Sequence, residues 1–137
     1  MTYGQDSGYL YYHNDLIGTG WSGRNIPNGV LGRNNSAAQD VHAIGPLPCG
    51  WYTIGPAYNS STKGPVTMTL TPDPENQMFG RGDFEIHGFA IGSDPDDPFN
   101  PSSDGCIIME RSVREKIAEQ IGTSGDNRLQ VVSTWTI

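Results

Sequence analysis

Glycine and proline interrupt this chain along its whole length and leave few stretches long enough for a helix. The 137 residues include 18 Gly and 10 Pro, which are spread through the sequence rather than gathered in one linker. Because both residue types end helices and favour turns, this pattern predicts a turn-rich, mainly β fold with one short helix. Repeats, low-complexity tracts and domain boundaries are not visible, so we expect a single domain over residues 1–137.

The charge balance excludes several classes of partner. The chain has 15 acidic and 8 basic side chains, a net charge of −7, and its Lys and Arg residues form no stripe. A phosphate backbone is therefore a disfavoured partner, and we expect no nucleic-acid binding. No run approaches the roughly 20 apolar residues of a membrane span, and the first residues, MTYGQDSGYLYY, lack the features of a secretory signal. We expect a soluble protein with no membrane partner and no Sec signal of its own.

Alternating apolar residues predict several short strands. The segment 9–17 should form a hairpin around Asn14-Asp15, whereas the Gly- and Asn-rich segment 18–40 should be a loop. Segment 49–54 has strand composition, and VTMTLT at 66–71 alternates strictly, which places Val66, Met68 and Leu70 on one face. The last alternating positions, Leu129, Val131, Ser133 and Trp135, should form a closing strand.

One segment carries the signals of a helix. Ser112 and Glu115 have the spacing of a capping box, and Gly122 stands where a C-terminal cap belongs. Val113, Ile117 and Ile121 repeat every four residues and form a narrow apolar stripe. We therefore expect a helix over 112–122 that packs on the sheet from outside.

A histidine and a cysteine stand at the ends of two further predicted strands. Segment 83–87 puts Phe84 and Ile86 on the core face and His87 on the opposite face, and Cys106 begins the apolar run CIIM. If these strands are neighbours, imidazole and thiol meet at one edge, where the imidazole can take the proton of the thiol. Gly105 would let backbone amides approach a developing oxyanion. A buried structural cysteine is the alternative, and the flanking residues favour the nucleophile.

The motifs around these two residues resemble the signature of the L,D-transpeptidases (YkuD-like). They are IHG at 86–88 and SDGCI at 103–107. A further motif, PLPCGWYTI at 46–54, is similar to a strand motif of that family. SG at 22–23, NIP at 25–27, GPLPCG at 45–50, GR at 80–81, and Arg111 and Arg114 resemble the compact branch delivered as type VI secretion effectors. The resemblance covers nearly the whole chain and implies an L,D-transpeptidase-like β-sandwich catalytic domain.

The resemblance also implies a reaction and a setting. The substrate would be the stem tetrapeptide of peptidoglycan, cleaved through a Cys acyl-enzyme, with transfer to a second stem, exchange with a D-amino acid, or carboxypeptidase action by water. No cofactor or metal is implied. The protein would be an antibacterial toxin that leaves the cell by type VI secretion, acts in the periplasm of the target cell, and has a cognate immunity protein as partner.

On the motif positions, the resemblance implies Cys106 as nucleophile, His87 as base and later acid, and the amides of Gly105 and Cys106 as oxyanion donors. Ser103 would hold the loop or the imidazole. We place Gly88, Asp104, Arg81 and Arg111 at the substrate-binding positions.

This chain departs from the family pattern at two positions. Asp104 replaces a second His, so that what orients His87 stays open, and Ile108 replaces an Arg or Asn. An inward carboxylate would raise the pKa of the thiol, so we expect Asp104 to face away from the sulfur. Arg81 or Arg111 would then receive a substrate carboxylate in place of the missing cation.

Other candidate sites are weaker. His13 and His42 match no common metal-binding spacing, and Asp94, Asp96 and Asp97 lack the pattern of a calcium loop, although their segment could cover the site as a lid. Cys49 is interpreted as structural. An alternative function is a non-catalytic cell-wall-binding module of the same fold, and a cysteine peptidase of unrelated fold ranks lower.

Overall fold

The computed structural model describes residues 1–134, which form nine strands, one α-helix and one short 3-10 helix. The elements are, in chain order, β1 (Thr2–Gly4), β2 (Tyr9–Tyr12), β3 (Asp15–Ser22), η1 (Ser36–Ala38), β4 (Gly50–Ile54), β5 (Tyr58–Ser60), β6 (Gly64–Pro72), β7 (Phe84–His87), β8 (Ile107–Met109), α1 (Arg111–Ser124) and β9 (Arg128–Val132). The prediction of a mainly β fold with one helix is confirmed.

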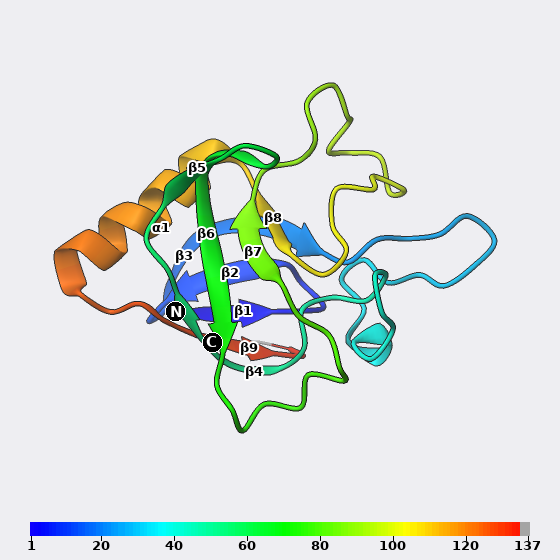
Figure 1. The fold of residues 1–137 in the computed structure, drawn as a ribbon, viewed down its shortest axis with the longest axis horizontal. Coiled ribbons are helices and arrows are strands. Elements are labelled where there is room, and N and C mark those ends of the chain that lie inside the picture. The colour runs from blue at the N-terminus through cyan, green and yellow to red at the C-terminus, as the bar shows by residue number, and fades with distance from the viewer. Residues whose placement is uncertain (135–137) are drawn as a thin grey trace.

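The sheet closes on itself into a barrel. Its strand order is β4-β9-β1-β2-β3-β8-β7-β6-β5, and an additional pairing joins β4 to β6, so that β5 alone lies outside the ring (Figure 1). Closure removes the exposed edges that an open sheet would leave. The family resemblance implied a sandwich of two sheets, whereas the strands form one continuous barrel wall. The pairs β1–β9 and β7–β8 are parallel.

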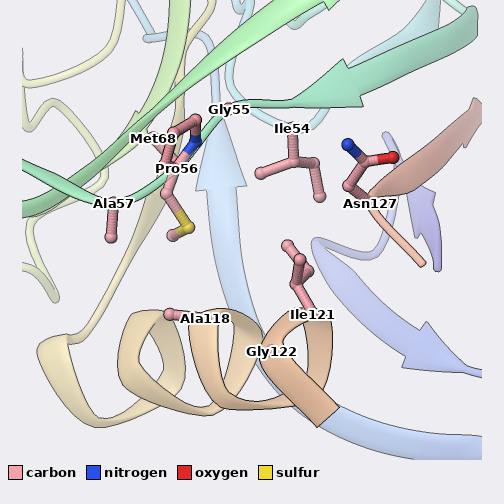
Figure 2. Close-up of a pocket in the computed structure, with 9 residues that line it drawn as sticks. All are labelled: Ile54, Gly55, Pro56, Ala57, Met68, Ala118, Ile121, Gly122 and Asn127. Atoms are coloured by element: carbon pink, nitrogen blue, oxygen red, sulfur yellow. The ribbon is translucent and has the colours of Figure 1, made fainter. Parts of the chain in front are cut away.

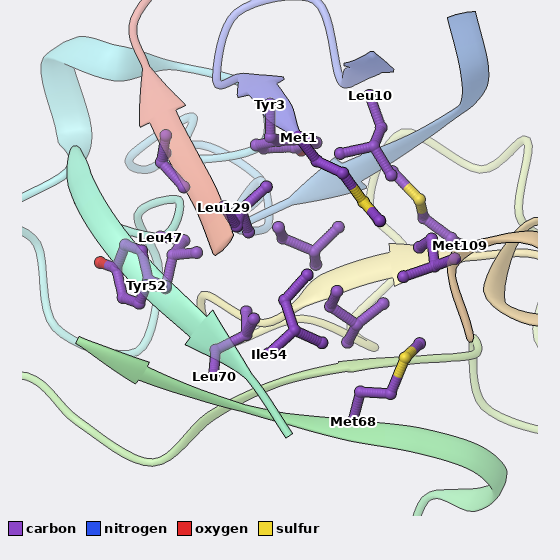
Figure 3. Close-up of a cluster of buried hydrophobic side chains, with 14 of the residues drawn as sticks. Met1, Tyr3, Leu10, Leu47, Tyr52, Ile54, Met68, Leu70, Met109 and Leu129 are labelled. Carbon is purple, nitrogen blue, oxygen red and sulfur yellow. The ribbon is translucent and has the colours of Figure 1, made fainter. Parts of the chain in front are cut away.

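The core fills the barrel and continues under α1. Figure 3 shows side chains from several strands meeting in this space, among them Tyr52, Met68 and Leu129. Val113 and Ile117 of α1 are buried with them, and Ile121 packs against the same cluster, as the predicted stripe requires. Burial of such side chains removes about 25 cal/mol of unfavourable hydration per Å² of apolar surface. The helix is thereby held against β3 and β6.

The helix is longer than predicted at both ends. Its N-cap is Glu110, without a side-chain cap, and its C-cap is Gly125, whose φ of 74° is left-handed. Ser112 and Gly122 therefore lie inside the helix, so the predicted capping box and C-cap are wrong. The N–H of Gly125 reaches the carbonyl of Ile121, which explains why the chain ends the helix there.

Two strand predictions also need correction. Residues 18–22, predicted as loop, belong to β3, and a Cβ at Gly18 would lie 2.6 Å from the Val113 side chain. Glycine there permits close packing of the helix on the strand. In β6 the alternation breaks at Val66, whose φ is 55°, and Thr67 is buried beside Met68. The hairpin turn lies at His13–Asn14, and the predicted position Trp135 lies outside the described residues.

Candidate active site

His87 and Cys106 lie on neighbouring parallel strands. β7 ends at His87 and β8 begins directly after Cys106, with Ile86 opposite Ile107 in the register. Sγ of Cys106 accepts a hydrogen bond of 3.3 Å from the backbone N–H of Glu85, two residues before His87. The charges of Lys63 and Glu85 act on the pKa of both side chains. Both residues are described, and no hydrogen bond joins thiol to imidazole in this resting arrangement, as is common before substrate binds.

The imidazole of His87 is held by the backbone. Its Nδ1 lies 2.7 Å from the carbonyl oxygen of Gly88, and the side chain is only 2% exposed. Because a carbonyl can only accept a hydrogen bond, Nδ1 carries the proton and Nε2 keeps its lone pair. The Gly88 carbonyl therefore orients His87, a function for which the sequence offered no residue.

The pKa values of the pair favour neutral groups. Burial lowers the pKa of His87, and burial together with the charge of Glu85 raises the pKa of the Cys106 thiol. The Glu85 N–H and the charge of Lys63 act in the opposite direction on the thiol and favour the thiolate. At neutral pH these shifts favour a thiol at Cys106 and a neutral imidazole at His87.

Ser103 shapes the turn that presents Cys106. Its buried Oγ accepts from the N–H groups of Gly23 and Gly105, at 2.8 and 3.1 Å, and donates to the Cys106 carbonyl at 2.6 Å. Gly105 has a φ of 130°, and its carbonyl accepts from Ser22 Oγ. Of the two functions expected of Ser103, these contacts match that of holding the loop.

Only one of the two backbone amides predicted to bind an oxyanion keeps that possibility. The N–H of Gly105 is committed to Ser103 Oγ, so it is not free to bind an oxyanion in this state. The Cys106 N–H is the remaining donor of the predicted pair. Gly105 instead contributes its conformation, because a Cβ there would lie 2.5 Å from both Arg81 Nη2 and the Phe84 ring.

Arg81 links the loops that precede Cys106. Arg81 is 7% exposed, and its guanidinium donates four hydrogen bonds, from Nη1 to the carbonyls of Gln39 and Pro46 and from Nη2 to those of Gly45 and Asp104. All four terminal N–H bonds are thereby used. This geometry favours a positioning function over the substrate binding predicted from the sequence.

The other predicted substrate-binding residues lie in different surroundings. The Asp104 side chain is 70% exposed, and its Oδ1 lies 3.6 Å from Nε of Arg24. Arg111 is 62% exposed on α1 and pairs with Glu115 one turn later. Gly88 is in place beside His87 and also lies close to Arg114, because a Cβ at Gly88 would be 2.8 Å from Arg114 Nη2.

A pocket of about 450 Å³ opens beside His87. The tip of the β5–β6 hairpin, the segment after β7 and α1 line it, with residues 60–65, 87–91, 101–102 and Arg114. Arg114 is the cation that sequence reasoning did not assign to the site. The spacing of three residues between Arg111 and Arg114 puts both on one side of α1, but only the buried Arg114 reaches the pocket.

A second pocket has no comparable chemistry. It lies between α1 and the segment after β4, holds about 380 Å³, and is lined mainly by apolar side chains such as Ile54, Met68 and Ile121 (Figure 2). No titratable residue lines it. This cavity therefore lacks a group for catalysis.

The segment between His87 and Cys106 is tied down. Arg33 donates to the carbonyls of Asp97 and Pro95, and Asn25 donates to that of Pro98. The buried Asn100 closes the base of the segment through bonds to Ser93 and Asp94. These hydrogen bonds join the loops around 23–35 and 88–104, which lie on the right of Figure 1.

The remaining candidates show no reactive arrangement. Cys49 and Cys106 are both free, and the Cys49 thiol donates to Oε1 of Gln5. His42 bonds to the Phe79 carbonyl, and the ring of His13 lies against that of Tyr12 in a tilted arrangement. Within residues 1–134, no three His, Cys, Asp or Glu side chains cluster in a way that could hold a metal. In the same residues no helix has the length and hydropathy needed to cross a membrane.

A family model described as the Tlde1 domain matches residues 18–134, which include every site residue discussed above. Curated proteins and solved structures gave no match.

Proposed function

Because the chain belongs to the Tlde1 domain family, a type VI secretion effector family, we propose that it is a cysteine L,D-transpeptidase and L,D-carboxypeptidase. Its substrate is the stem tetrapeptide of peptidoglycan. The observation that carries the proposal is the placement of two residues: Cys106 lies directly before β8, and His87 ends the neighbouring strand β7, where its Nδ1 faces the Gly88 carbonyl and leaves Nε2 unprotonated. A thiol beside a held, neutral imidazole suits acyl transfer.

The first half of the reaction forms an acyl-enzyme. Nε2 of His87 takes the proton of the Cys106 thiol as Sγ bonds to the carbonyl carbon between the third and fourth residues of the stem. The Cys106 N–H donates to the oxygen that becomes negative. When the tetrahedral intermediate collapses, the C–N bond breaks and the departing D-residue takes the proton from Nε2 as its amine.

The second half releases the tripeptide acyl group. An amine or a water molecule gives a proton to Nε2 and bonds to the acyl carbon, and as the C–S bond breaks Nε2 passes this proton to Sγ. A second stem gives a cross-link, a D-amino acid gives an exchanged tetrapeptide, and water gives the free tripeptide. The same two side chains serve all three outcomes.

The setting follows from the family. As a type VI secretion effector, the protein would be delivered to a rival cell and act on the wall in the periplasm. The producing cell would need a cognate immunity protein that covers the site. Export of the protein to the periplasm of a test strain should therefore be toxic, and Cys106→Ala should abolish this toxicity.

Intact-mass spectrometry with a disaccharide-tetrapeptide tests the chemistry directly. We expect an acyl adduct or loss of the terminal D-Ala with the native protein and with Cys49→Ala, and neither with Cys106→Ala. Cys49→Ala is the matched control, because it removes the other free thiol away from the site. A folded native protein that leaves the tetrapeptide intact while a control enzyme consumes it would contradict the proposal.

One observation favours a second candidate, a non-catalytic wall-binding module of the same fold. Burial and Glu85 raise the pKa of Cys106, which lowers its thiolate fraction. For such a module, the protein would bind tetrapeptide equally well with Cys106 or with Ala at this position and would form no product. The product analysis above separates the two functions.

A further inference from the structure

The pocket beside His87 is lined by basic residues, although the protein as a whole is acidic. The chain carries a net charge of −7, yet Lys63, His87 and Arg114 are the titratable side chains among the residues that line the pocket, and none of the lining residues is acidic. The hydroxyl groups of Ser60, Ser61 and Thr62 add donors at the same rim. Such a lining suits an anionic group of the substrate.

Arg114 is held so that one nitrogen remains available. Its Nε donates to the Met109 carbonyl at 3.0 Å, and Nη1 donates to the carbonyls of Pro65 and Val66 at 2.5 and 3.2 Å. Within the described residues, Nη2 has no hydrogen-bond acceptor. Nη2 lies where Gly88 has no side chain to cover it. The guanidinium is thus fixed by the protein and has two unused N–H donors beside His87.

The positions of Cys106, His87 and the pocket indicate which end of the substrate enters the pocket. His87 lines the pocket and Cys106 does not. Because His87 must give its proton to the departing amine, the departing residue lies on the imidazole side of the sulfur. The α-carboxylate of that residue is only two bonds from its nitrogen. It therefore falls on the side where the pocket holds Lys63 and Arg114.

We propose that Arg114 and Lys63 bind the free α-carboxylate of the departing D-residue, so that the enzyme releases only a residue that ends the stem. This inference rests on the proposed function and adds its specificity. A free D-amino acid acting as acceptor would place its carboxylate in the same pocket, because attack on the acyl-enzyme retraces the departure of the amine.

The test compares two substrates with matched variants. Release of the terminal residue is measured for the disaccharide-tetrapeptide and for the same molecule with a C-terminal carboxamide. We expect kcat/KM to be at least about tenfold higher for the acid, which corresponds to about 1.4 kcal/mol. In Lys63→Gln and Arg114→Gln this ratio should fall toward one, whereas Lys116→Gln, an exposed charge elsewhere on α1, should keep it.

The possible outcomes distinguish failure of this inference from failure of the proposed transpeptidase function. A ratio near one with the native protein, or an unchanged ratio in both pocket variants, overturns the inference and leaves the transpeptidase intact. Absence of Cys106-dependent release from either substrate overturns both. Arg114 also supports the fold through its carbonyl contacts, so Arg114→Gln could fail to fold. In that case the test relies on the acid-to-carboxamide ratio of Lys63→Gln, which changes an exposed hairpin residue.

Discussion

The backbone N–H of Glu85 points at Sγ of Cys106 over 3.3 Å, while the carboxylate of the same residue raises the pKa of that thiol. The backbone and the side chain of Glu85 thus shift the pKa of the Cys106 thiol in opposite directions. The backbone donor is fixed by strand β7, whereas the carboxylate, which accepts a hydrogen bond from Tyr58, can be removed by mutation.

Removal of this carboxylate should make the thiol more reactive. In Glu85→Gln the pKa of Cys106 should fall, because a like charge beside the thiolate is lost. We expect alkylation by iodoacetamide at pH 8 to become about two- to fivefold faster. Lys63→Gln should slow it, since it removes an opposite charge. Equal rates in all three proteins would show that these charges do not reach the sulfur.

The acid limb of the activity profile should lie lower than for an exposed histidine. Burial lowers the pKa of His87, so the imidazole stays unprotonated as pH falls through about 6.5, the ordinary histidine value. Activity is lost only below the lowered pKa, where Nε2 gains a proton and cannot act as base. A profile of kcat/KM against pH measures the midpoint, and a midpoint above 6.5 would contradict the assignment.

Ser103 should matter for stability as well as for activity. Ser103→Ala removes an oxygen that makes three hydrogen bonds with Gly23, Gly105 and Cys106. At about 1 kcal/mol each, we expect the free energy of unfolding to fall by about 2–3 kcal/mol and the activity to fall with it. Ser112→Ala, an exposed change within α1, should alter neither quantity. Urea unfolding followed by fluorescence measures the difference.

Arg81 should be required for a properly held nucleophile. Arg81→Gln leaves several of the four carbonyls bound by the guanidinium without a partner. Each unpaired buried acceptor costs about 1–3 kcal/mol, so we expect a loss of about 3 kcal/mol or more in stability. Arg24→Gln, which removes the ion pair with the exposed Asp104 and an exposed hydrogen bond to the Ala43 carbonyl, is the control and should cost about 1 kcal/mol or less. Thermal denaturation of the three proteins gives the comparison.

Gly122 inside α1 and Gly125 at its C-cap should respond in opposite directions to the same change. Gly122→Ala should raise the free energy of unfolding by about 0.5–1 kcal/mol, because Gly122 lies inside the helix with open space around its Cα. Gly125→Ala should lower it by about 1 kcal/mol, since Gly125 has a φ of 74°. If Gly122 were the cap, as the sequence pattern predicted, the order would be reversed.

Local patterns predicted the strands that carry the chemistry better than they predicted the surroundings. The alternation around Phe84 and the apolar run after Cys106 were enough to place His87 at the end of one strand and Cys106 directly before another. By contrast, the sequence around Gly18 suggested a loop, although Gly18 lies in β3. A glycine is needed there because the side chain of Val113, distant in the sequence, packs against it. Whether a cation faces the site depends on burial, so Arg81 and Arg114, both buried, could not be told apart from the exposed Arg111 by their position in the chain.

The parallel pairing of β1 with β9 has a consequence for how the protein is made. Strand β9 also pairs with β4, so it joins the first strand of the chain to the middle of the chain. During synthesis, β7 and β8 emerge before this link exists, and the barrel wall stays open until residues 128–132 have left the ribosome. Contacts between such distant segments form slowly. The barrel that holds His87 and Cys106 therefore closes only after β9 has been made and has paired with both β1 and β4.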